Sequence, residues 1–266
     1  MQEPHLIFGT WPLEGDAAQA AIEMALAAGY RALDTAQWYG NEAEVGAAIR
    51  ATGAKGIRIA TKVKPENLTP ESFMPSVRES LDRLGTDCVD LLFMHWPPYD
   101  DAVFDAMVDT LNDARSAGYC REIAISNATT RLMERAVARS PAKIAVNQIE
   151  FHPLINQEKI RATARRLDMS LQGYCSLGRG EALNQPATLS VAKAHGVSEA
   201  TVILAWILAQ GISPVTMTTK PKNAIANLSA ETLVLSPTEL DAISALRAVH
   251  RRVVDIPELN PIWDGI

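Results

Sequence analysis

The chain has 266 residues, 47% of them hydrophobic, which is enough for one large domain with a sizeable core. Its 25 basic and 31 acidic residues give a formal net charge of −6, which argues against a nucleic-acid partner because such binding needs a concentrated basic face. The longest apolar stretch, Thr201 to Leu208, is far too short to span a bilayer.

Short apolar runs alternate with amphipathic stretches along the whole chain. The apolar runs predict eight strands, at Leu6–Thr10, Arg31–Thr35, Ile57–Val63, Cys88–His95, Glu122–Ser126, Ile144–Ile149, Ser170–Tyr174 and Ile212–Thr216. The helical periodicity between and after them predicts helices at Asp16–Ala28, Glu42–Ala51, Pro70–Leu84, Asp101–Ala117, Thr130–Ala138, Gln157–Leu167, Ala187–His195, Ser198–Gln210, Pro221–Asn227 and Thr238–Val249.

This alternation predicts the fold class. Apolar strands separated by helices indicate a parallel sheet buried on both faces. Eight such units suit a closed (β/α)8 TIM barrel better than an open doubly wound sheet. No linker rich in Pro, Gly or Ser divides the chain, so we expect a single α/β domain over residues 1–266.

Several common motifs are missing. The sequence has no P-loop, HExxH, paired CxxC or GxSxG motif, and GRGEAL at 178–183 lacks the third glycine of GxGxxG. Any dinucleotide must therefore be held by loops at the strand ends, and we expect no metal site. The beginning of the chain, MQEPHLIFGTWP, has no signal-peptide pattern, and the three cysteines suit a reducing compartment. We therefore expect a cytoplasmic protein.

Reactive side chains lie at or just after the ends of the second, third and fourth predicted strands. Asp34 ends the second strand and Tyr39 lies in the loop after it, while Lys62 and His95 end the third and fourth strands. In a parallel barrel these positions face the same rim, where active sites lie. Four ionisable types at one rim form a more specific signal than any one of them alone.

The four residues predict proton donation to a carbonyl oxygen during hydride transfer. A free phenol has a pKa near ~10 and is a poor acid at neutral pH. The Lys62 ammonium can lower that pKa by stabilising the phenolate, and Asp34 can hold Lys62 charged and oriented. His95 can donate a hydrogen bond to the substrate oxygen or help pass the proton to Tyr39.

Each residue taken singly has a structural interpretation. Asp34 could be a turn or helix-cap residue, and Tyr39 an aromatic residue at the rim. Lys62 could be an exposed charge and His95 a packed turn residue. Together, however, the four residues favour an active site. A barrel isomerase or aldolase that uses Lys62 as a Schiff-base amine, without nicotinamide, remains an alternative.

These motifs resemble the aldo-keto reductases in order and spacing. The resemblance covers essentially the whole chain and lies in FGTWPL (8–13), LDTAQWYGNEAEVG (33–46), IATKV (59–63), DLLFMHWP (90–97), AISNAT (124–129), NQIEFHPL (147–154), GYCSLGRG (173–180) and RRVVDIPELNPIWD (251–264). It implies a (β/α)8 barrel, reduction of aldehydes and ketones with NADPH or NADH, and a monomer.

The resemblance also implies roles for individual residues. Asp34, Tyr39, Lys62 and His95 become the catalytic set, with Tyr39 as general acid. Tyr174 stacks on the nicotinamide, which exposes one ring face to the substrate. The implied cofactor-binding residues are Thr10, Trp11, Asp34, Ser126, Asn127, Gln148, Tyr174, Ser176, Leu177, Arg179, Thr216, Met217, Thr218, Asn223 and Asn227.

One departure from the family pattern concerns the 2′-phosphate of NADPH. Met217 stands where the family usually has a Lys, and Asn223 where it has an Arg. A charged hydrogen bond to phosphate is worth roughly 1.5–3 kcal/mol, so we expect relaxed selectivity with appreciable use of NADH. Lys220 and Lys222 lie nearby and either compensate or are simply solvated.

Four tryptophans are candidates for the substrate pocket: Trp11, Trp38, Trp96 and Trp263. They favour carbonyl compounds with an apolar or aromatic flank, although each can instead be a packing residue. The short connection WPPYD at 96–100 predicts an open pocket. The alternative function is a nicotinamide-binding regulatory subunit that turns over negligibly, which the intact catalytic set disfavours.

Overall fold

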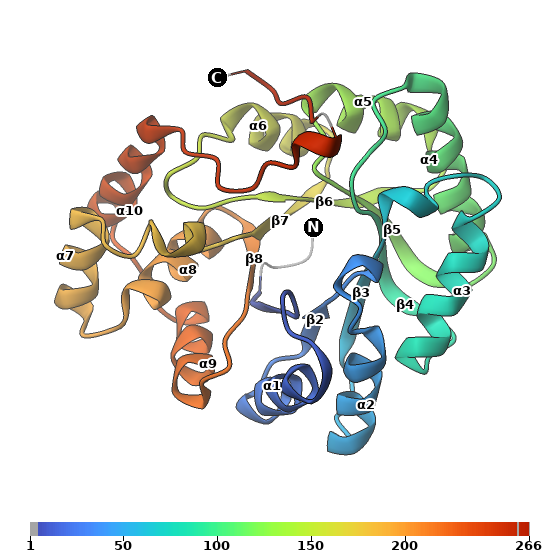
Figure 1. Cartoon of the computed structure of the whole chain (residues 1–266). Coiled ribbons are helices and arrows are strands. Elements are labelled where there is room, and N and C mark those ends of the chain that lie inside the picture. Colours follow the sequence, from blue (N-terminus) through green and yellow to red (C-terminus); the bar gives the residue numbers. More distant parts are fainter. Residues whose placement is uncertain (1–4, 260, 266) are drawn as a thin grey trace.

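A computed structural model describes residues 5–259 and 261–265 as a closed barrel of eight parallel strands surrounded by helices (Figure 1). The strands pair in sequence order and β8 returns to β1, which confirms the predicted (β/α)8 barrel. They are β1 (Ile7–Gly9), β2 (Ala32–Asp34), β3 (Arg58–Val63), β4 (Val89–Met94), β5 (Cys120–Ser126), β6 (Ile144–Glu150), β7 (Ser170–Tyr174) and β8 (Ile212–Thr216).

Ten α-helices lie in the described residues, each at a predicted place. They are α1 (Gly15–Ala28), α2 (Glu42–Thr52), α3 (Phe73–Leu84), α4 (Asp101–Ser116), α5 (Thr130–Arg139), α6 (Glu158–Arg166), α7 (Pro186–His195), α8 (Glu199–Ala209), α9 (Pro221–Leu228) and α10 (Pro237–Ser244). The predicted last helix was too long, because after Ser244 the chain tightens into a 3-10 helix over Ala245–Val249. The interpretation of the first residues as lacking a signal peptide falls partly on residues 1–4, outside the described chain.

Strand register brings the reactive residues to one end of the barrel. Gly9 pairs with Asp34, and Asp34 pairs with Ala60 on β3. Side chains two apart on a strand share a face, so Lys62 lies above Ala60 and beside Phe93 of β4. The strands end close to the predicted positions: β3 continues one residue past Lys62, and β4 ends just before His95.

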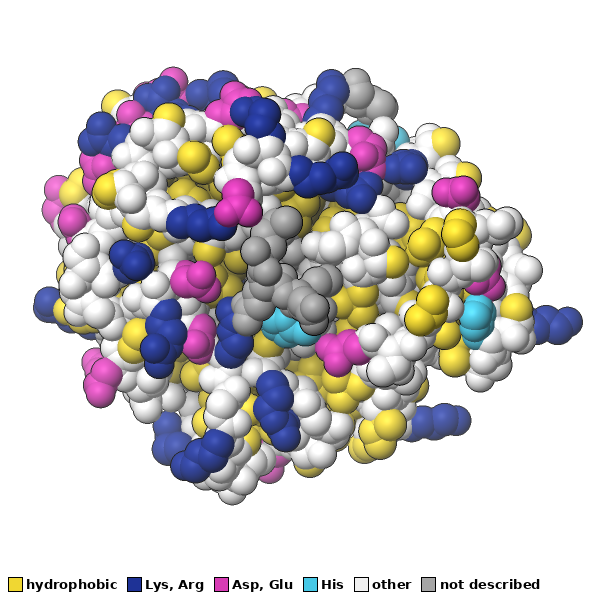
Figure 2. Space-filling view, turned by 180° about the vertical axis from the view of Figure 1, so that it is seen from behind, with side chains coloured by type: hydrophobic (Ala, Val, Ile, Leu, Met, Phe, Trp, Pro, Cys, Tyr) yellow, Lys and Arg dark blue, Asp and Glu magenta, His cyan; other side chains and the backbone are white. Residues whose placement is uncertain are grey.

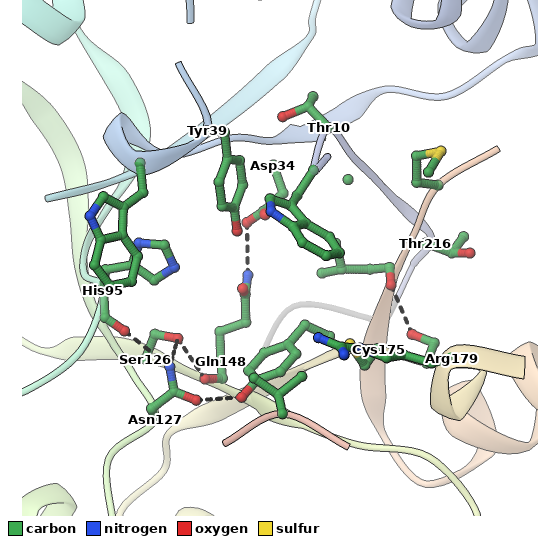
Figure 3. Close-up of a pocket in the computed structure, with 18 of the residues that line it drawn as sticks. Thr10, Asp34, Tyr39, His95, Ser126, Asn127, Gln148, Cys175, Arg179 and Thr216 are labelled. Carbon is green, nitrogen blue, oxygen red and sulfur yellow. Dashed lines mark hydrogen bonds between the residues drawn. The ribbon is translucent and has the colours of Figure 1, made fainter. Parts of the chain in front are cut away.

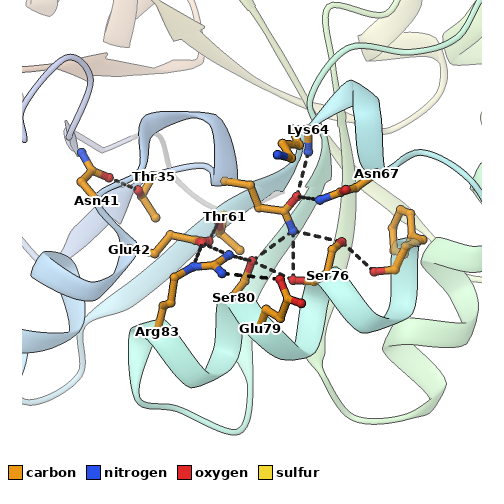
Figure 4. Close-up of polar contacts among 12 residues, drawn as sticks. Thr35, Asn41, Glu42, Thr61, Lys64, Asn67, Ser76, Glu79, Ser80 and Arg83 are labelled. Carbon is orange, nitrogen blue, oxygen red and sulfur yellow. Dashed lines mark hydrogen bonds and ion pairs between the residues drawn. The ribbon is translucent and has the colours of Figure 1, made fainter. Parts of the chain in front are cut away.

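A buried carboxylate ties α2 and α3 to the barrel (Figure 4). Glu42, which is only 1% exposed, accepts hydrogen bonds from Arg83 Nη2 at 2.7 Å and from Thr61 Oγ1 of β3 at 2.5 Å. Removing Arg83 would leave this buried carboxylate without its cationic partner, which destabilises the fold. Glu42 therefore fixes both helices against the strand that carries Lys62.

The face opposite the view of Figure 1 carries interspersed basic and acidic side chains (Figure 2). Within the described residues, a test of length and hydropathy finds no single helix able to cross a membrane; only α7 and α8 pass it as a pair, bent by 99°. In the same residues, no three His, Cys, Asp or Glu side chains gather as a possible metal site.

Gly46→Ala is expected to destabilise the protein by about 2 kcal/mol, because α2 and α3 touch through this residue. A Cβ at Gly46 would lie 2.3 Å from the carbonyl oxygen of Leu84, a backbone atom that cannot rotate away. Urea unfolding measures the change. The control, Ala47→Gly on the same helix, should lose only about 1 kcal/mol of helix propensity. A Gly46→Ala protein as stable as wild type would contradict this packing constraint.

Candidate active site

The reactive residues surround a cavity of about 420 Å³ at the carboxyl ends of the strands (Figure 3). Residues from seven of the eight βα units and from the C-terminal segment form its wall. They are Gly9, Thr10, Trp11, Asp34, Trp38, Tyr39, His95, Trp96, Ser126, Asn127, Gln148, Tyr174, Cys175, Ser176, Leu177, Arg179, Val215, Thr216, Met217, Val254, Asp255 and Ile256.

A fully buried ammonium lies beneath this cavity. The Lys62 side chain is 0% exposed, and its Nζ donates to Asp34 Oδ1 at 2.5 Å, to the Thr35 carbonyl at 3.0 Å and to the Tyr39 hydroxyl at 3.3 Å. The second Asp34 oxygen accepts from Gln148 Nε2 at 2.7 Å. The pair is therefore satisfied on both sides, as a buried ion pair must be.

These contacts determine where the Tyr39 proton points. A lysine ammonium has three N–H donors and no acceptor, and all three donors of Lys62 are used. The Tyr39 oxygen receives one of them, so its own hydrogen cannot point at Lys62. The phenolic O–H is left to donate into the cavity that Tyr39 lines.

The charges shift the pKa values of both groups. Burial raises the pKa of Tyr39, and the Lys62 ammonium offsets this only in part. Burial alone would lower the pKa of Lys62, but Asp34 and Tyr39 outweigh it and the net shift is upward. The expected lowering by Lys62 is therefore present, but the expected net fall in the Tyr39 pKa is wrong, because burial is the larger effect.

His95 is held as a neutral imidazole. Burial, and then repulsion from Lys62, lowers the pKa of His95 well below 6.5. Its ring packs edge-on against Tyr39, with centroids 5.7 Å apart, and against Trp38 at 5.5 Å. Its Nδ1 is buried and has no hydrogen-bond partner among the described residues. A neutral imidazole has one N–H donor, which suits it to a carbonyl oxygen placed beside Tyr39.

Gln37 fixes the short 3-10 turn Gln37–Tyr39 that presents the phenol. Its amide nitrogen donates to the Ser76 carbonyl at 3.1 Å and to Ser80 Oγ at 3.1 Å, both on α3. Its amide oxygen accepts from the Lys64 backbone N–H at 3.1 Å and from the Asn67 amide at 2.9 Å. The turn is thus tied to α3 and to the loop after β3; sequence reasoning assigned Gln37 no role.

An amide and hydroxyl network forms the opposite wall (Figure 3). Asn127 adopts a left-handed backbone conformation (φ 60°), which Asn tolerates better than most residues. Its amide nitrogen donates to the His95 carbonyl at 3.1 Å, and its oxygen accepts from the Tyr174 hydroxyl at 2.6 Å. Ser126 Oγ donates to the Gln148 carbonyl at 2.9 Å. The network places two amides and a hydroxyl beside an aromatic ring, with the amide N–H groups of Asn127 and Gln148 bonded within the protein.

The predicted cofactor residues divide into two groups. Most line the cavity, with Arg179 6.0 Å from the Trp11 ring centroid. Thr218, Asn223 and Asn227 do not line it: Asn223 is exposed in the first turn of α9, and Asn227 is buried in the last turn of the same helix. A guanidinium at the rim and the Tyr174 ring in the wall fit an extended, anionic dinucleotide.

The tryptophans differ in their placement. Trp11, Trp38 and Trp96 line the cavity; Trp11 is 52% exposed, whereas Trp96 is 5% exposed. Trp263 does not line it, but packs edge-on behind Trp96 with centroids 5.9 Å apart. The predicted aromatic pocket therefore comprises three wall residues and one supporting residue.

Sequence reasoning missed a wall made by the C-terminal segment. Val254, Asp255 and Ile256 line the cavity although they follow the last helix by about ten residues. The segment has little regular structure, so periodicity gave no signal, although the motif RRVVDIPELNPIWD was part of the resemblance. The missed wall includes a charged side chain, Asp255.

Comparisons with known proteins bear on the whole chain. A sequence model of the Aldo/keto reductase family matches residues 5–248. "Methylglyoxal reductase DkgB" of Escherichia coli O157:H7 is 40% identical over 268 residues, covering 99% of this chain and 100% of that protein. An "Aldo-keto reductase" of Mycolicibacterium paratuberculosis is 33% identical, covering 92% and 86% respectively.

Solved structures agree with the sequence matches. A crystal structure described as that of a candidate 2,5-diketo-D-gluconic acid reductase B superposes with a TM-score of 0.93, at 38% identity over 98% of this chain and 93% of the other. An aldo-keto reductase of Bombyx mori, crystallised with NADP, gives a TM-score of 0.86 at 26% identity over 96% and 92%.

The lowered pKa of His95 predicts a specific loss of stability in acid. Below pH 6.5, His95 is protonated in the unfolded chain but stays neutral in the folded protein. The free energy of unfolding therefore falls as the pH decreases from 6.5 towards the folded-state pKa. The slope approaches about 1.4 kcal/mol per pH unit. Urea unfolding from pH 7.5 to 5 should show this contribution in wild type and not in His95→Gln. Parallel curves for the two proteins would mean that His95 titrates normally.

Proposed function

The chain belongs to the aldo/keto reductase family, and from this we propose that it reduces small aldehydes and ketones with NADPH or NADH, with Tyr39 as general acid. The observation that carries the proposal is the saturation of Lys62, whose three donors are used by Asp34, Thr35 and Tyr39. That arrangement leaves a protonated phenol whose hydrogen can be donated only into the cavity.

The raised pKa values suit reduction. A general acid must hold its proton until the substrate oxygen gains charge, and burial keeps Tyr39 protonated at neutral pH. The fully buried Lys62 ammonium then stabilises the phenolate as it forms. Asp34 keeps the ammonium charged and in place. The Lys62–Asp34 ion pair therefore stabilises the phenolate that forms when Tyr39 gives up its proton, rather than making the resting phenol more acidic.

His95 and the amide wall orient the reactants. Neutral His95 donates to the same carbonyl oxygen without adding a competing acid. A bound reduced nicotinamide supplies the hydride, and Ser126, Asn127 and Gln148 would hold its carboxamide while Tyr174 packs on the ring. The Tyr174 hydroxyl is fixed by Asn127, so the ring plane is set before any ligand binds.

The Schiff-base alternative finds no support in the site. An amine nucleophile must be neutral and accessible, whereas Lys62 is fully buried, has a raised pKa and uses all its N–H groups. A silent regulatory subunit would need no aligned phenol, ammonium and imidazole. Both alternatives are therefore weaker than a working reductase.

Small carbonyl compounds as substrates agree with the open cavity and with the names of the relatives. One relative is named a methylglyoxal reductase and one solved structure a diketogluconic acid reductase, so both names point to dicarbonyl substrates. The connection between β4 and α4 is only residues 95–100, which leaves the cavity mouth uncovered on that side, and Trp11 and Trp38 remain exposed. We propose a permissive pocket for small aldehydes and α-dicarbonyl compounds.

Tyr39→Phe is expected to lower kcat by about 10²–10⁴-fold for methylglyoxal and benzaldehyde, because it removes the proton donor. Loss of cofactor absorbance in steady state measures the rate. Quenching of protein fluorescence on titration with NADPH should change little, since the ring stays in place. Activity within a few-fold of wild type would overturn the role of Tyr39, and a wild type inactive on every aldehyde would overturn the reductase.

We also propose that the chain uses NADH appreciably beside NADPH. Met217 lines the cavity and cannot pair with a phosphate, while Asn223 is exposed nearby on α9. Lys220 and Lys222, at the beginning of that helix, are exposed as well. The two positions that grip the 2′-phosphate in the family are thus uncharged here.

Met217→Lys with Asn223→Arg should raise the NADPH-to-NADH ratio of kcat/KM by about tenfold or more per added charge. The matched control, Lys220→Met with Lys222→Met, separates the two explanations for whatever selectivity exists. If wild type prefers NADPH more than about a thousandfold and the control removes that preference, the two lysines supply the grip and relaxed selectivity is wrong.

A further inference from the structure

The C-terminal segment crosses the end of the barrel and forms part of the cavity wall. After the 3-10 helix Ala245–Val249 the chain runs back from α10 towards α5, as Figure 1 shows in red. Of this segment, Val254, Asp255 and Ile256 line the cavity. Asp255 is therefore a charged residue in a wall that is otherwise largely apolar and aromatic on the tryptophan side.

A buried glutamate holds this wall in position. Glu150, at the end of β6, is 1% exposed. Its Oε1 accepts the Val253 backbone N–H at 2.7 Å and its Oε2 the Val254 N–H at 2.9 Å. Farther along, Asp264 accepts from the Thr130 N–H at 2.8 Å and from its hydroxyl at 2.7 Å. The segment is fastened on both sides of Asp255, so the position of that carboxylate is determined by the fold.

Contacts place Asp255 on the substrate side of the cavity. Asp255 Oδ1 accepts a hydrogen bond from Trp263 Nε1 at 3.2 Å, and Trp263 packs against Trp96, the residue after His95. Tyr99 lies in the same region: burial is the main cause of its raised pKa, and the Asp255 charge adds to it. The proposed cofactor groups, Tyr174 and Arg179, belong instead to the β7 side.

Among the residues that the structure describes, no cationic side chain forms an ion pair with Asp255, whose carboxylate accepts a hydrogen bond from Trp263. Three charged side chains line the wall among the described residues: Asp34, Arg179 and Asp255. Asp34 is neutralised by Lys62, and Arg179 lies over Trp11 and belongs to the proposed cofactor-binding residues. Arg252 does not line the cavity; its guanidinium stacks on the Trp263 ring at 3.6 Å and lies 3.7 Å from Glu150. With Asp34 neutralised and Arg179 assigned to the cofactor, the Asp255 carboxylate is the charge of this wall that a substrate carboxylate would meet.

We propose that Asp255 is a specificity-determining residue that makes this enzyme select neutral carbonyl compounds over those that carry a carboxylate. The inference rests on the proposed reductase activity and adds the charge class of its substrate. It separates the two kinds of dicarbonyl named by the relatives: a neutral compound such as methylglyoxal is favoured, and a sugar acid such as a diketogluconate is disfavoured. Since Asp255 is solvent-exposed, the discrimination is moderate and weakens with salt.

An isosteric substrate pair tests this proposal: 4-formylbenzamide and 4-carboxybenzaldehyde, which differ in charge at one group. Wild type should show a higher kcat/KM for the amide, and Asp255→Asn should shrink the ratio about three- to tenfold by improving the carboxylate alone. Raising the ionic strength from 0.05 to about 1 M should shrink the wild-type ratio in the same direction. The matched control is Glu258→Gln, an exposed carboxylate three residues away that does not line the cavity.

Three results would overturn the proposal: an unchanged ratio in Asp255→Asn, an equal gain for both aldehydes, or an equal effect of Glu258→Gln. Inactivity of wild type on both aldehydes and on methylglyoxal would instead defeat the proposed reductase. In that case, calorimetric titration with benzamide and benzoate tests the charge selection by Asp255, because it measures binding without turnover. Tighter binding of benzamide that Asp255→Asn equalises supports the charge selection, and equal binding to wild type ends it.

Discussion

The buried contact between Lys62 and Asp34 is the constraint on which the site depends. An unpaired ammonium at this depth would lose its proton, since transfer from water into a protein interior strongly disfavours charge. Asp34 at 2.5 Å reverses that outcome, and the pKa of Lys62 rises above its usual value. The barrel makes this possible because β2 and β3 are neighbours, and their register puts Lys62 two residues beyond the partner of Asp34.

The same constraint assigns opposite electrostatic roles to Tyr39 and His95. Both lie near one positive charge in a poorly hydrated wall. For Tyr39, burial disfavours the phenolate and Lys62 favours it, so the proton is retained but its departure is assisted. For His95, burial and Lys62 both disfavour the imidazolium, so the ring stays neutral. In the proposed reaction, the Lys62 charge thus leaves Tyr39 as the single acid facing the cavity, which avoids competition between two proton donors.

The fold was predictable because local and global signals agree. Strands such as VDLLFM are apolar on both faces, which only a sheet covered on both sides accommodates, and the eightfold repetition of strand and helix indicated closure. The expectation that Asp34, Lys62 and His95 lie together followed from their positions at strand ends, since side chains at the carboxyl ends of parallel strands share one rim. The β5 strand begins earlier than predicted, at Cys120, because pairing with Val89 extends it through polar residues.

Other parts of the site had no such local signal. Gln37 acts through four partners on α3 and the loop after β3, which are close only in the folded chain. The net pKa of Tyr39 depends on the extent of burial, which composition does not give. Glu150 reads from the sequence as one more strand-end residue, yet it holds a segment about a hundred residues later through two backbone N–H groups. Such contacts use backbone N–H groups, which every residue except proline has, so the pattern of side chains in the sequence does not predict them.

The two halves of the cavity consequently differ in how they are built. The reacting groups lie on strands or on a turn tied to a strand, so their positions follow from the barrel itself. The substrate wall that contains Asp255 lies on an extended segment whose position depends on Glu150 and on Asp264. Changes in that segment can alter which carbonyl compounds enter without moving Lys62 or Tyr39, because the two sets of contacts share no residue. On the proposed assignment, the fold separates the chemistry, whose residues are held by the barrel, from substrate selection, which a few residues after the last helix can change.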